Sequence, residues 1–307
     1  MAPIDRFAPS PTSPLHLGNL RTALAGWLLT RADAGTWLLR VEDLDRARVM
    51  AARGVEGQLI ADLRSLGLTW DPPVLRQSQR AAAYREALAQ LSGLTYECFC
   101  TRREIAEASS APHDDGFRPY PGTCSRLSTA QAARLRRERP AAIRIRAEGA
   151  RFTVEDTFAG PVTGVVDDFV LVRGDGQASY NFAVVVDDVA CGVTRVTRAR
   201  DLLASAPRQA WLTTQLGGVP PSYAHLGLVT DASGHRLAKR HGAVTMADLA
   251  GRGWDPADVL AELTASLGLG RHRSVADALM WLRRHGPSER FWAGAVWDDT
   301  AHSLRAG

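Results

Sequence analysis

The sequence predicts an α/β fold in which a parallel sheet is interrupted by an insertion. Short strand patterns alternate with amphipathic helix patterns in the first part of the chain, and this alternation is typical of parallel sheets. From about residue 96 to 126 cysteines, prolines and glycines replace any clear period, and strand patterns follow. We therefore expect a sheet domain in two parts, an insertion between them and a helical C-terminal region, with the limits 1–95, 96–179, 180–244 and 245–307.

The first part of the sheet domain begins as strand, turn and helix. We expect a short buried strand at 6–8, after which three prolines keep the chain extended. Apolar residues then recur at helical spacing from Leu20 to Ala32, which predicts a helix ending near Gly35. The apolar segment WLLRVED predicts a strand, and the next two amphipathic stretches predict helices. These three elements are expected at 37–43, 53–66 and 81–92.

The insertion and the C-terminal region differ in their expected structure. Alternating segments in the insertion predict strands at 143–147, 152–156 and 169–180, the last with a glycine turn at 174–176. Helix and strand patterns resume from Phe182 to about Thr230 and belong to the second part of the sheet domain. Beyond Val244 the apolar spacing is helical, and it predicts helices at 255–269 and 275–286.

The composition is that of an ordinary soluble globular protein. The chain has 307 residues, of which 45% are hydrophobic and 23% charged, and this excludes a disordered, collagen-like or coiled-coil protein. No apolar run reaches the roughly 18 residues that span a bilayer, and no signal peptide is visible. Four cysteines do not make a disulfide framework. We expect a cytoplasmic monomer without a membrane partner.

The basic residues single out one position. Lysine and arginine together number 37, and the sequence contains a single lysine, Lys239, so that 36 are arginine. A compact, flexible ammonium group cannot always be replaced by a planar guanidinium, and Lys239 is therefore a candidate functional residue. The net charge of +4 and the pI near 9.1 suit a polyanionic partner.

Two segments have features of phosphate binding. The segment RFAPSPTSPLHLGN (6–19) places His16 and Gly18 where a strand passes into a helix, and the free N–H groups of a helix N-terminus bind phosphate. The basic segment ASGHRLAKRHGA (232–243) carries Lys239, which could reach a triphosphate. Each segment has a plainer interpretation when taken alone, as a helix cap and as a solvated basic surface loop.

Together the two segments resemble the HIGH and KMSKS motifs of class I aminoacyl-tRNA synthetases, which join a carboxylate to ATP. RFAPSPT, LLRVEDLDRAR, QSQR and the segment 180–203 are similar to the glutamyl-tRNA synthetase group, up to about residue 250. Little chain follows the lysine segment, as in the truncated paralogues of that group, which attach glutamate to the base queuosine in tRNA(Asp). The resemblance implies a Rossmann-like catalytic domain with a zinc-bearing insertion.

The resemblance also implies the reaction. ATP and L-glutamate would give glutamyl-adenylate and pyrophosphate with the help of Mg²⁺, and the glutamyl group would pass to tRNA(Asp) carrying queuosine. His16 and Lys239 are expected to stabilise charge on the leaving pyrophosphate. The expected ATP-binding residues are His16, Gly18, Asn19 and Lys239.

A pocket for glutamate needs two arginines and one carboxylate, because the substrate has two carboxylates and one ammonium group. Arg6, Arg198 and Glu42 stand at the matching family positions. Arg195 and Arg200 crowd the same segment as Arg198, and which arginine holds which carboxylate stays open. The remaining expected pocket residues are Phe7, Ala8, Pro9, Ser10 and Tyr180.

Three clustered cysteines, Cys98, Cys100 and Cys124, suit a structural Zn²⁺ site, since zinc prefers four tetrahedral ligands. The resemblance implies Tyr120 as the fourth ligand, and His113 is an alternative. The plainer interpretation is a group of buried or free cysteines. Cys191 stands apart and is expected in the core.

The chain departs from the family pattern at four positions, and three other functions stay open. Ser13 and Ala199 replace glycines, while Arg236 and Ala238 change the lysine motif. The alternatives are a truncated glutamyl-tRNA synthetase that charges a tRNA 3′ end, a non-catalytic tRNA-binding module and a zinc-dependent hydrolase. A closed Cys₃Tyr site opposes the hydrolase, because it leaves no open coordination position.

Overall fold

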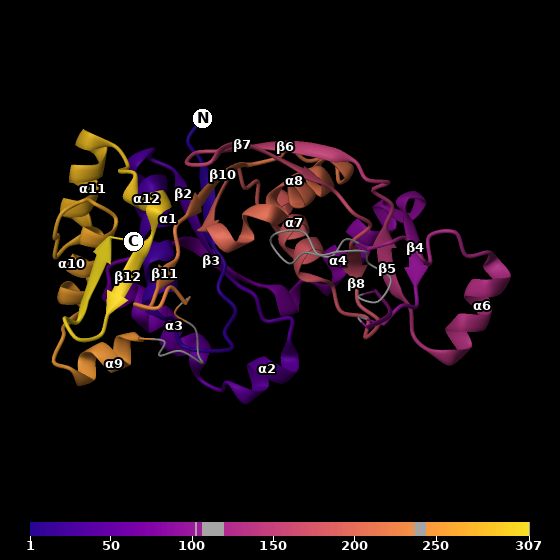
Figure 1. Ribbon diagram of the computed structural model, residues 1–307, viewed down its shortest axis with the longest axis horizontal. Helices are drawn as coiled ribbons and strands as arrows, with labels where there is room; N and C mark the ends of the chain where they lie inside the picture. The colour runs from indigo at the N-terminus through magenta and orange to yellow at the C-terminus, as the bar shows by residue number, and fades with distance from the viewer. Residues whose placement is uncertain (102, 106–119, 236, 238–243, 307) are drawn as a thin grey trace.

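The computed structural model describes residues 1–101, 103–105, 120–235, 237 and 244–306 (Figure 1). Its helices and strands form a central sheet region with an insertion at one end and a helical region at the other. In Figure 1 the helices α10 (Pro256–Ser266) and α11 (Val275–His285) lie at one end, and α6 (Thr129–Glu138) lies at the opposite end. None of the helices in the described ranges combines the length and apolar character needed to cross a membrane.

The first part of the central region is a parallel three-stranded sheet, as the alternation predicted. Its strands lie in the order β1-β2-β3, and helix α1 fills the connection between β1 and β2. Four leucines along the inner side of α1 are fully buried, which explains the helical spacing seen in the sequence. The elements are β1 (Ile4–Phe7), α1 (Leu17–Ala32), β2 (Thr36–Val41), α2 (Arg46–Ala51), α3 (Val55–Ser65), β3 (Asp71–Arg76), η1 (Gln77–Gln79), α4 (Ala81–Gln90) and η2 (Ser92–Leu94).

Two elements of this part were not expected. Strand β3 contains Pro72 and Pro73, and prolines argue against a central strand. The two prolines are tolerated here because β3 lies at the edge of its sheet. Helix α2 buries no residue, so its sequence has no regular spacing of apolar residues from which a helix could be predicted. Strand β1 also starts two residues before the expected limit of 6–8.

The second part of the central region forms a four-stranded sheet in the order β7-β6-β10-β9. Its outer strand β9 lies beside β1, where the Thr194 N–H group donates to Ile4 O at 2.9 Å. The buried Asp5 carboxylate strengthens this contact, because it accepts from the Thr197 N–H group at 3.1 Å. The elements are β6 (Arg151–Asp156), β7 (Gly160–Val165), α7 (Tyr180–Ala190), β9 (Arg195–Ala199), η3 (Arg200–Ser205), α8 (Ala206–Gln215) and β10 (Ser222–Leu226).

The segment 96–179 thus contributes to two sheets. Its β6–β7 hairpin joins the central region, while β4 (Thr95–Cys98), β5 (Ala142–Ile145) and β8 (Val170–Val172) form a separate antiparallel sheet. Strand β8 is shorter than the expected 169–180, because a turn follows it and Ser179 then caps helix α7. The four domain limits remain predictions.

The C-terminal region contains the expected helices and two strands besides. Helices α10 and α11 pack against α1, and their buried leucines join the same core. Strand β12 pairs with β11, which precedes the lysine segment, so the region closes back onto the central part. The elements are β11 (Val229–Thr230), α9 (Met246–Gly251), α10, α11, α12 (Arg290–Ala293), β12 (Ala295–Asp298) and β13 (Ser303–Ala306).

Candidate functional site

Two arginines from neighbouring parallel strands share one buried carboxylate. Arg6 near the end of β1 donates from Nε to Asp188 Oδ1 at 3.0 Å, and Arg40 on β2 donates from Nη1 to the same oxygen at 2.6 Å. Arg40 Nη2 also lies 3.4 Å from Glu42 Oε1. Arg6 uses Nε for this contact, and its two terminal amino groups form no hydrogen bond with the residues that the structure describes.

The charges of this cluster balance one another despite burial. Burial by itself would raise the pKa of Asp188, but the Arg40 and Arg6 guanidinium groups outweigh it and hold the pKa below the usual 3.8. Burial raises the pKa of Glu42, while Arg40 and Arg6 oppose that rise. Arg6 keeps its proton, since Asp188 raises the arginine pKa against the effect of burial. The cluster therefore presents a permanently cationic Arg6.

A second buried network holds Arg198 on β9. Its Nε donates to His225 Nε2 at 3.0 Å, and its Nη1 donates to Gln209 Oε1 at 2.6 Å. His225 Nδ1 lies 2.6 Å from Asp156 Oδ2, so the neutral ring carries its proton on Nδ1 and accepts at Nε2. Burial lowers the pKa of His225, and the nearby Arg198 charge lowers it further, while the hydrogen bond that the ring donates to Asp156 opposes this shift.

Tyr180 stands at the start of α7 and is 43% exposed. Partial burial of the hydroxyl raises its pKa and the Glu42 charge adds to the rise, while the Arg198 and Arg6 charges oppose it. The Glu42 N–H group also donates to Pro9 O at 3.0 Å, which holds the chain after β1 beside Glu42. Of the expected glutamate-binding residues, the contacts thus join Arg6, Glu42 and Pro9, while Arg198 belongs to the second network.

The crowding of arginines around Arg198 is resolved by their contacts. Arg195 pairs with Asp33 at 2.7 Å, and Arg200 lies over the Trp292 ring at 5.7 Å. Phe7 is buried and stacks on Trp37 with 6.1 Å between ring centroids, so it forms part of the core beside the site.

The candidate phosphate site is the N-terminus of α1. His16 caps this helix: its Nδ1 accepts from the Gly18 N–H group at 3.1 Å, and its own N–H group donates to Asn19 Oδ1 at 3.3 Å. Since Nδ1 is an acceptor, the neutral imidazole carries its proton on Nε2. A Cβ atom at Gly18 would lie 3.0 Å from the His16 ring, so glycine suits this close approach.

The lysine segment is anchored at the same place. Val244 O accepts from the Leu17 N–H group at 2.9 Å, and Thr245 forms an isolated antiparallel bridge with His16. On the other side of the segment, the buried Leu237 donates its N–H group to Val229 O at 3.1 Å. The expected residues Lys239, Arg236, Ala238 and His113 lie outside the described residues.

The three cysteines of the insertion meet around Tyr120. The sulfur atoms of Cys98, Cys100 and Cys124 all lie within 4.8 Å of one another. Tyr120 Oη lies 3.4 Å from Cys98 Sγ and 3.6 Å from Cys100 Sγ, and Cys100 Sγ lies 3.5 Å from Cys124 Sγ. Zinc–sulfur bonds of about 2.3 Å in a tetrahedron place the ligands about 3.8 Å apart. The four groups are therefore spaced as zinc ligands.

The surroundings of this cluster also favour a metal. The Arg144 guanidinium lies 3.7 Å from the centroid of the Tyr120 ring, where it offsets the excess negative charge of thiolate ligands. Burial would raise the pKa of Cys98, but hydrogen bonds with Tyr120 and Arg144 bring it below the usual 9.0. The Phe99 N–H group donates to Cys124 Sγ at 3.4 Å. Cys191 lies apart, half-buried at the end of α7.

Sequence reasoning missed Arg40, Asp188, His225 and Asp156 as members of the site. Arg40 and Asp188 did carry a signal, because each is a charged residue inside an otherwise apolar strand or helix segment. Charged side chains are almost never fully buried unless they are paired. His225 and Asp156 carried no comparable signal, since the contact between them depends on the pairing of β6 with β10.

Comparisons with known proteins agree with this arrangement. The family model described as tRNA synthetases class I (E and Q), catalytic domain, matches residues 4–296. The chain is 55% identical over 267 residues to the glutamyl-Q tRNA(Asp) synthetase of Nocardia farcinica, covering 86% of this chain and 84% of the relative. It is 54% identical over 264 residues to the protein of that name from Cutibacterium acnes, covering 86% and 76%.

The fold is shared with longer proteins. A crystal structure of glutamate-tRNA synthetase from Elizabethkingia anophelis superimposes with a TM-score of 0.79 at 24% identity, over 98% of this chain and 69% of that one. At this identity the likeness concerns the fold alone.

Proposed function

The chain belongs to the class I tRNA synthetase (E and Q) catalytic domain family, and from this membership we propose that it glutamylates the queuosine of tRNA(Asp). Its relatives from Nocardia farcinica and Cutibacterium acnes carry the name of that activity. The substrates are then ATP, L-glutamate and tRNA(Asp) bearing queuosine.

One observation carries the choice of glutamate: Arg6 and Glu42 belong to one buried charged cluster, joined through Asp188 and Arg40. Two separately anchored guanidinium groups, of Arg6 and Arg198, suit the two carboxylates of glutamate, and Glu42 suits its ammonium group. Tyr180 would add a hydroxyl donor. The described hydrogen-bond partners of Arg198 are the neutral groups of His225, Gln209 and Leu202 O. An amino acid with a single carboxylate would leave one of the two guanidinium charges without a substrate carboxylate, which favours glutamate.

Activation needs no enzyme nucleophile. An oxygen of the glutamate α-carboxylate forms a bond to the α-phosphorus of ATP, the bond from that phosphorus to the bridging oxygen breaks, and pyrophosphate leaves. The chain's part is to position the reactants and stabilise charge. We assign that role to the N–H groups at the start of α1, to the Nε2–H group of His16 and to Lys239, and Mg²⁺ bound with ATP would supply further positive charge.

In the second step a hydroxyl of the cyclopentene-diol of queuosine attacks the glutamyl carbonyl. The new ester bond forms, AMP leaves, and the hydroxyl proton passes to solvent. This diol resembles the ribose diol of a terminal adenosine, so an active site of this family can serve either acceptor.

Zn²⁺ in the insertion is proposed as a structural ion. Cys98, Cys100, Cys124 and Tyr120 would hold it, and it would fix the edge of the β4-β5-β8 sheet rather than take part in chemistry. The observed spacing of the sulfur atoms and of Tyr120 Oη supports this role.

The deciding experiment is transfer of labelled glutamate to purified tRNAs. We expect label on tRNA(Asp) that contains queuosine and none on tRNA(Glu). The matched control is tRNA(Asp) from cells unable to make queuosine, which should stay unlabelled. Equal labelling of that control, or a preference for tRNA(Glu), would show that the chain instead charges a tRNA 3′ end.

A further inference from the structure

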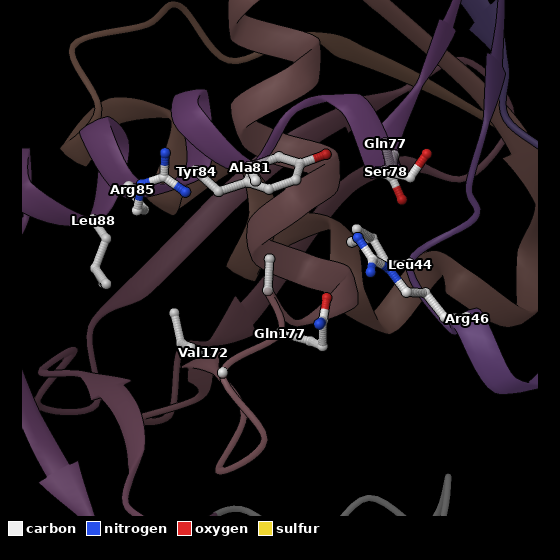
Figure 2. A pocket seen from close by; sticks show the side chains of 12 residues that line it. Leu44, Arg46, Gln77, Ser78, Ala81, Tyr84, Arg85, Leu88, Val172 and Gln177 are labelled. Carbon is white, nitrogen blue, oxygen red and sulfur yellow. The ribbon is translucent and has the colours of Figure 1, made fainter.

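A cavity of about 240 Å³ lies between the first sheet and the insertion (Figure 2). Tyr84 and Leu88 from α4 form one wall, and Val172 from β8 lies across from them (Figure 2). Arg46 and Gln177 project toward the cavity from other sides. None of the expected site residues lines it.

Part of the wall is already ordered by internal hydrogen bonds. Gln77 Nε2 and the Tyr84 hydroxyl both donate to Asp187 Oδ2, at 3.0 and 2.9 Å. Ser78 donates from N and from Oγ to Asp43, at 2.7 and 2.6 Å. The cavity therefore keeps its shape without a ligand, as binding pockets usually do.

Three other polar side chains of the wall differ from these. The side chains of Arg46, Arg85 and Gln177 form no hydrogen bond or ion pair within the part of the chain that the structure describes. The neighbouring Arg80 and Arg76, by contrast, are paired with Asp187 and Glu56. Two unpaired guanidinium groups and one unpaired amide around an apolar wall suit a ligand that combines an anionic group, a flat ring and a polar edge.

The cavity adjoins the site built around Arg6. Leu44, in its wall, follows Glu42 by two residues. Asp187, which orders the wall, is the neighbour of Asp188, which holds Arg6 and Arg40. Asp187 thus contacts the cavity wall, and Asp188 contacts the arginines of the amino-acid site.

We propose that this cavity binds an unstacked nucleotide of the tRNA loop, next in sequence to the base that accepts glutamate. The proposal rests on the proposed function. Single-stranded RNA is recognised by packing bases against aromatic or apolar side chains and by hydrogen bonds to base edges, while arginines contact the phosphates. Tyr84, Leu88 and Val172 supply the packing surface. Gln177 reads the base edge, and Arg46 and Arg85 bind the flanking phosphates.

The first test uses the double variant R46Q/R85Q. Its ATP–pyrophosphate exchange with glutamate should stay within about twofold of wild type, while KM for tRNA rises roughly tenfold or more. Each phosphate contact to a single strand contributes about 0.7 to the slope of log affinity against log salt, so this slope should fall by about 1.4. The matched control is R284Q, which removes an exposed arginine of α11 at the opposite end of the molecule (Figure 1).

The second test addresses the base edge. Replacing the base on one side of the acceptor should slow transfer by wild type, replacing the base on the other side should not, and Q177A should lose this discrimination. If wild type labels queuosine tRNA(Asp) and the cavity variants behave like R284Q, the cavity assignment is wrong and the proposed function stands. A raised KM for ATP or glutamate would also overturn the assignment. Failure of wild type to label queuosine tRNA would overturn both.

Discussion

His16 and Thr245 form an isolated antiparallel bridge, and each caps the N-terminus of a helix, α1 and α9 respectively. The bridge joins the candidate phosphate-binding segment 6–19 to the residues that follow the lysine segment. The next residues reinforce it, since the Leu17 N–H group donates to Val244 O. Segment 6–19 and the residues after the lysine segment are more than 200 positions apart in the sequence, and backbone contacts hold them side by side.

Replacing Lys239 with arginine should remove most adenylate formation. The other 36 basic residues are arginines, so the retained lysine points to a role that a guanidinium does not fill. Loss of one charge-stabilising donor typically lowers the rate about 10²–10³-fold. Pyrophosphate exchange measures the effect, and circular dichroism checks the fold. A rate within a few-fold of wild type would exclude the role assigned to Lys239.

Replacing His225 should weaken glutamate binding more than it slows chemistry. In H225L, Arg198 Nε loses its acceptor and Asp156 loses its donor. Hydrogen bonds to charged groups contribute about 1.5–3 kcal/mol, so KM for glutamate should rise roughly 10- to 100-fold. H225Q keeps an amide that can accept from Arg198 and should recover part of the loss. Identical KM values in both variants and wild type would show that Arg198 is positioned without His225.

Stability should depend on pH through the same histidine. The pKa of His225 lies below 6.5 in the folded chain, because burial and the facing Arg198 charge outweigh the hydrogen bond to Asp156, which raises the pKa. Tyr223 stacks on the same ring. As the pH falls below about 6.5, the unfolded chain binds a proton that the folded chain does not, so the free energy of unfolding decreases. The slope is at most about 1.4 kcal/mol per pH unit.

Urea unfolding of wild type and H225Q between about pH 7.5 and pH 5.5 isolates this contribution. The difference in free energy of unfolding between the two proteins should shrink as the pH falls. A constant difference over this range would contradict the lowered pKa of His225.

Removal of Arg40 should destabilise the fold. R40M leaves the buried Asp188 with only Arg6 and deprives Glu42 of its partner, and breaking a buried pair in this way typically costs about 3–5 kcal/mol. The matched control is R48M, since Arg48 is 69% exposed and lies 4.0 Å from Asp45. That change should alter the free energy of unfolding by less than about 1 kcal/mol. Equal effects of the two variants would refute the structural role of Arg40.

The cysteine cluster should bind about one zinc ion per chain. C98S and C124S should lose the metal and loosen the insertion, whereas C191S should keep it, because Cys191 lies outside the cluster. Elemental analysis of the purified variants measures this. Wild-type protein that is folded, active and free of metal would disprove the zinc site.

Much of the architecture followed from local patterns. Helix α1, strand β2, helix α3 and helix α4 were expected because apolar spacing within one short segment reflects burial on one face. Strand β3, helix α2, helix α6 and strand β12 were missed. Prolines at a sheet edge, helices that bury no side chain, and a strand that pairs across the lysine segment leave no such local signal.

The sequence by itself determined the kinds of group available for chemistry: a histidine and glycine at a helix start, a solitary lysine, and three cysteines near a tyrosine. Residue type alone did not separate Arg195, Arg198 and Arg200, because identical side chains on one segment differ only in what they face, and only the family resemblance favoured Arg198. The tertiary structure gives the three different surroundings, since the pairing of β9 with β10 places His225 against Arg198. It likewise recruited Asp188 and Arg40, since strand order and helix packing, rather than residue type, bring distant charges into one buried cluster.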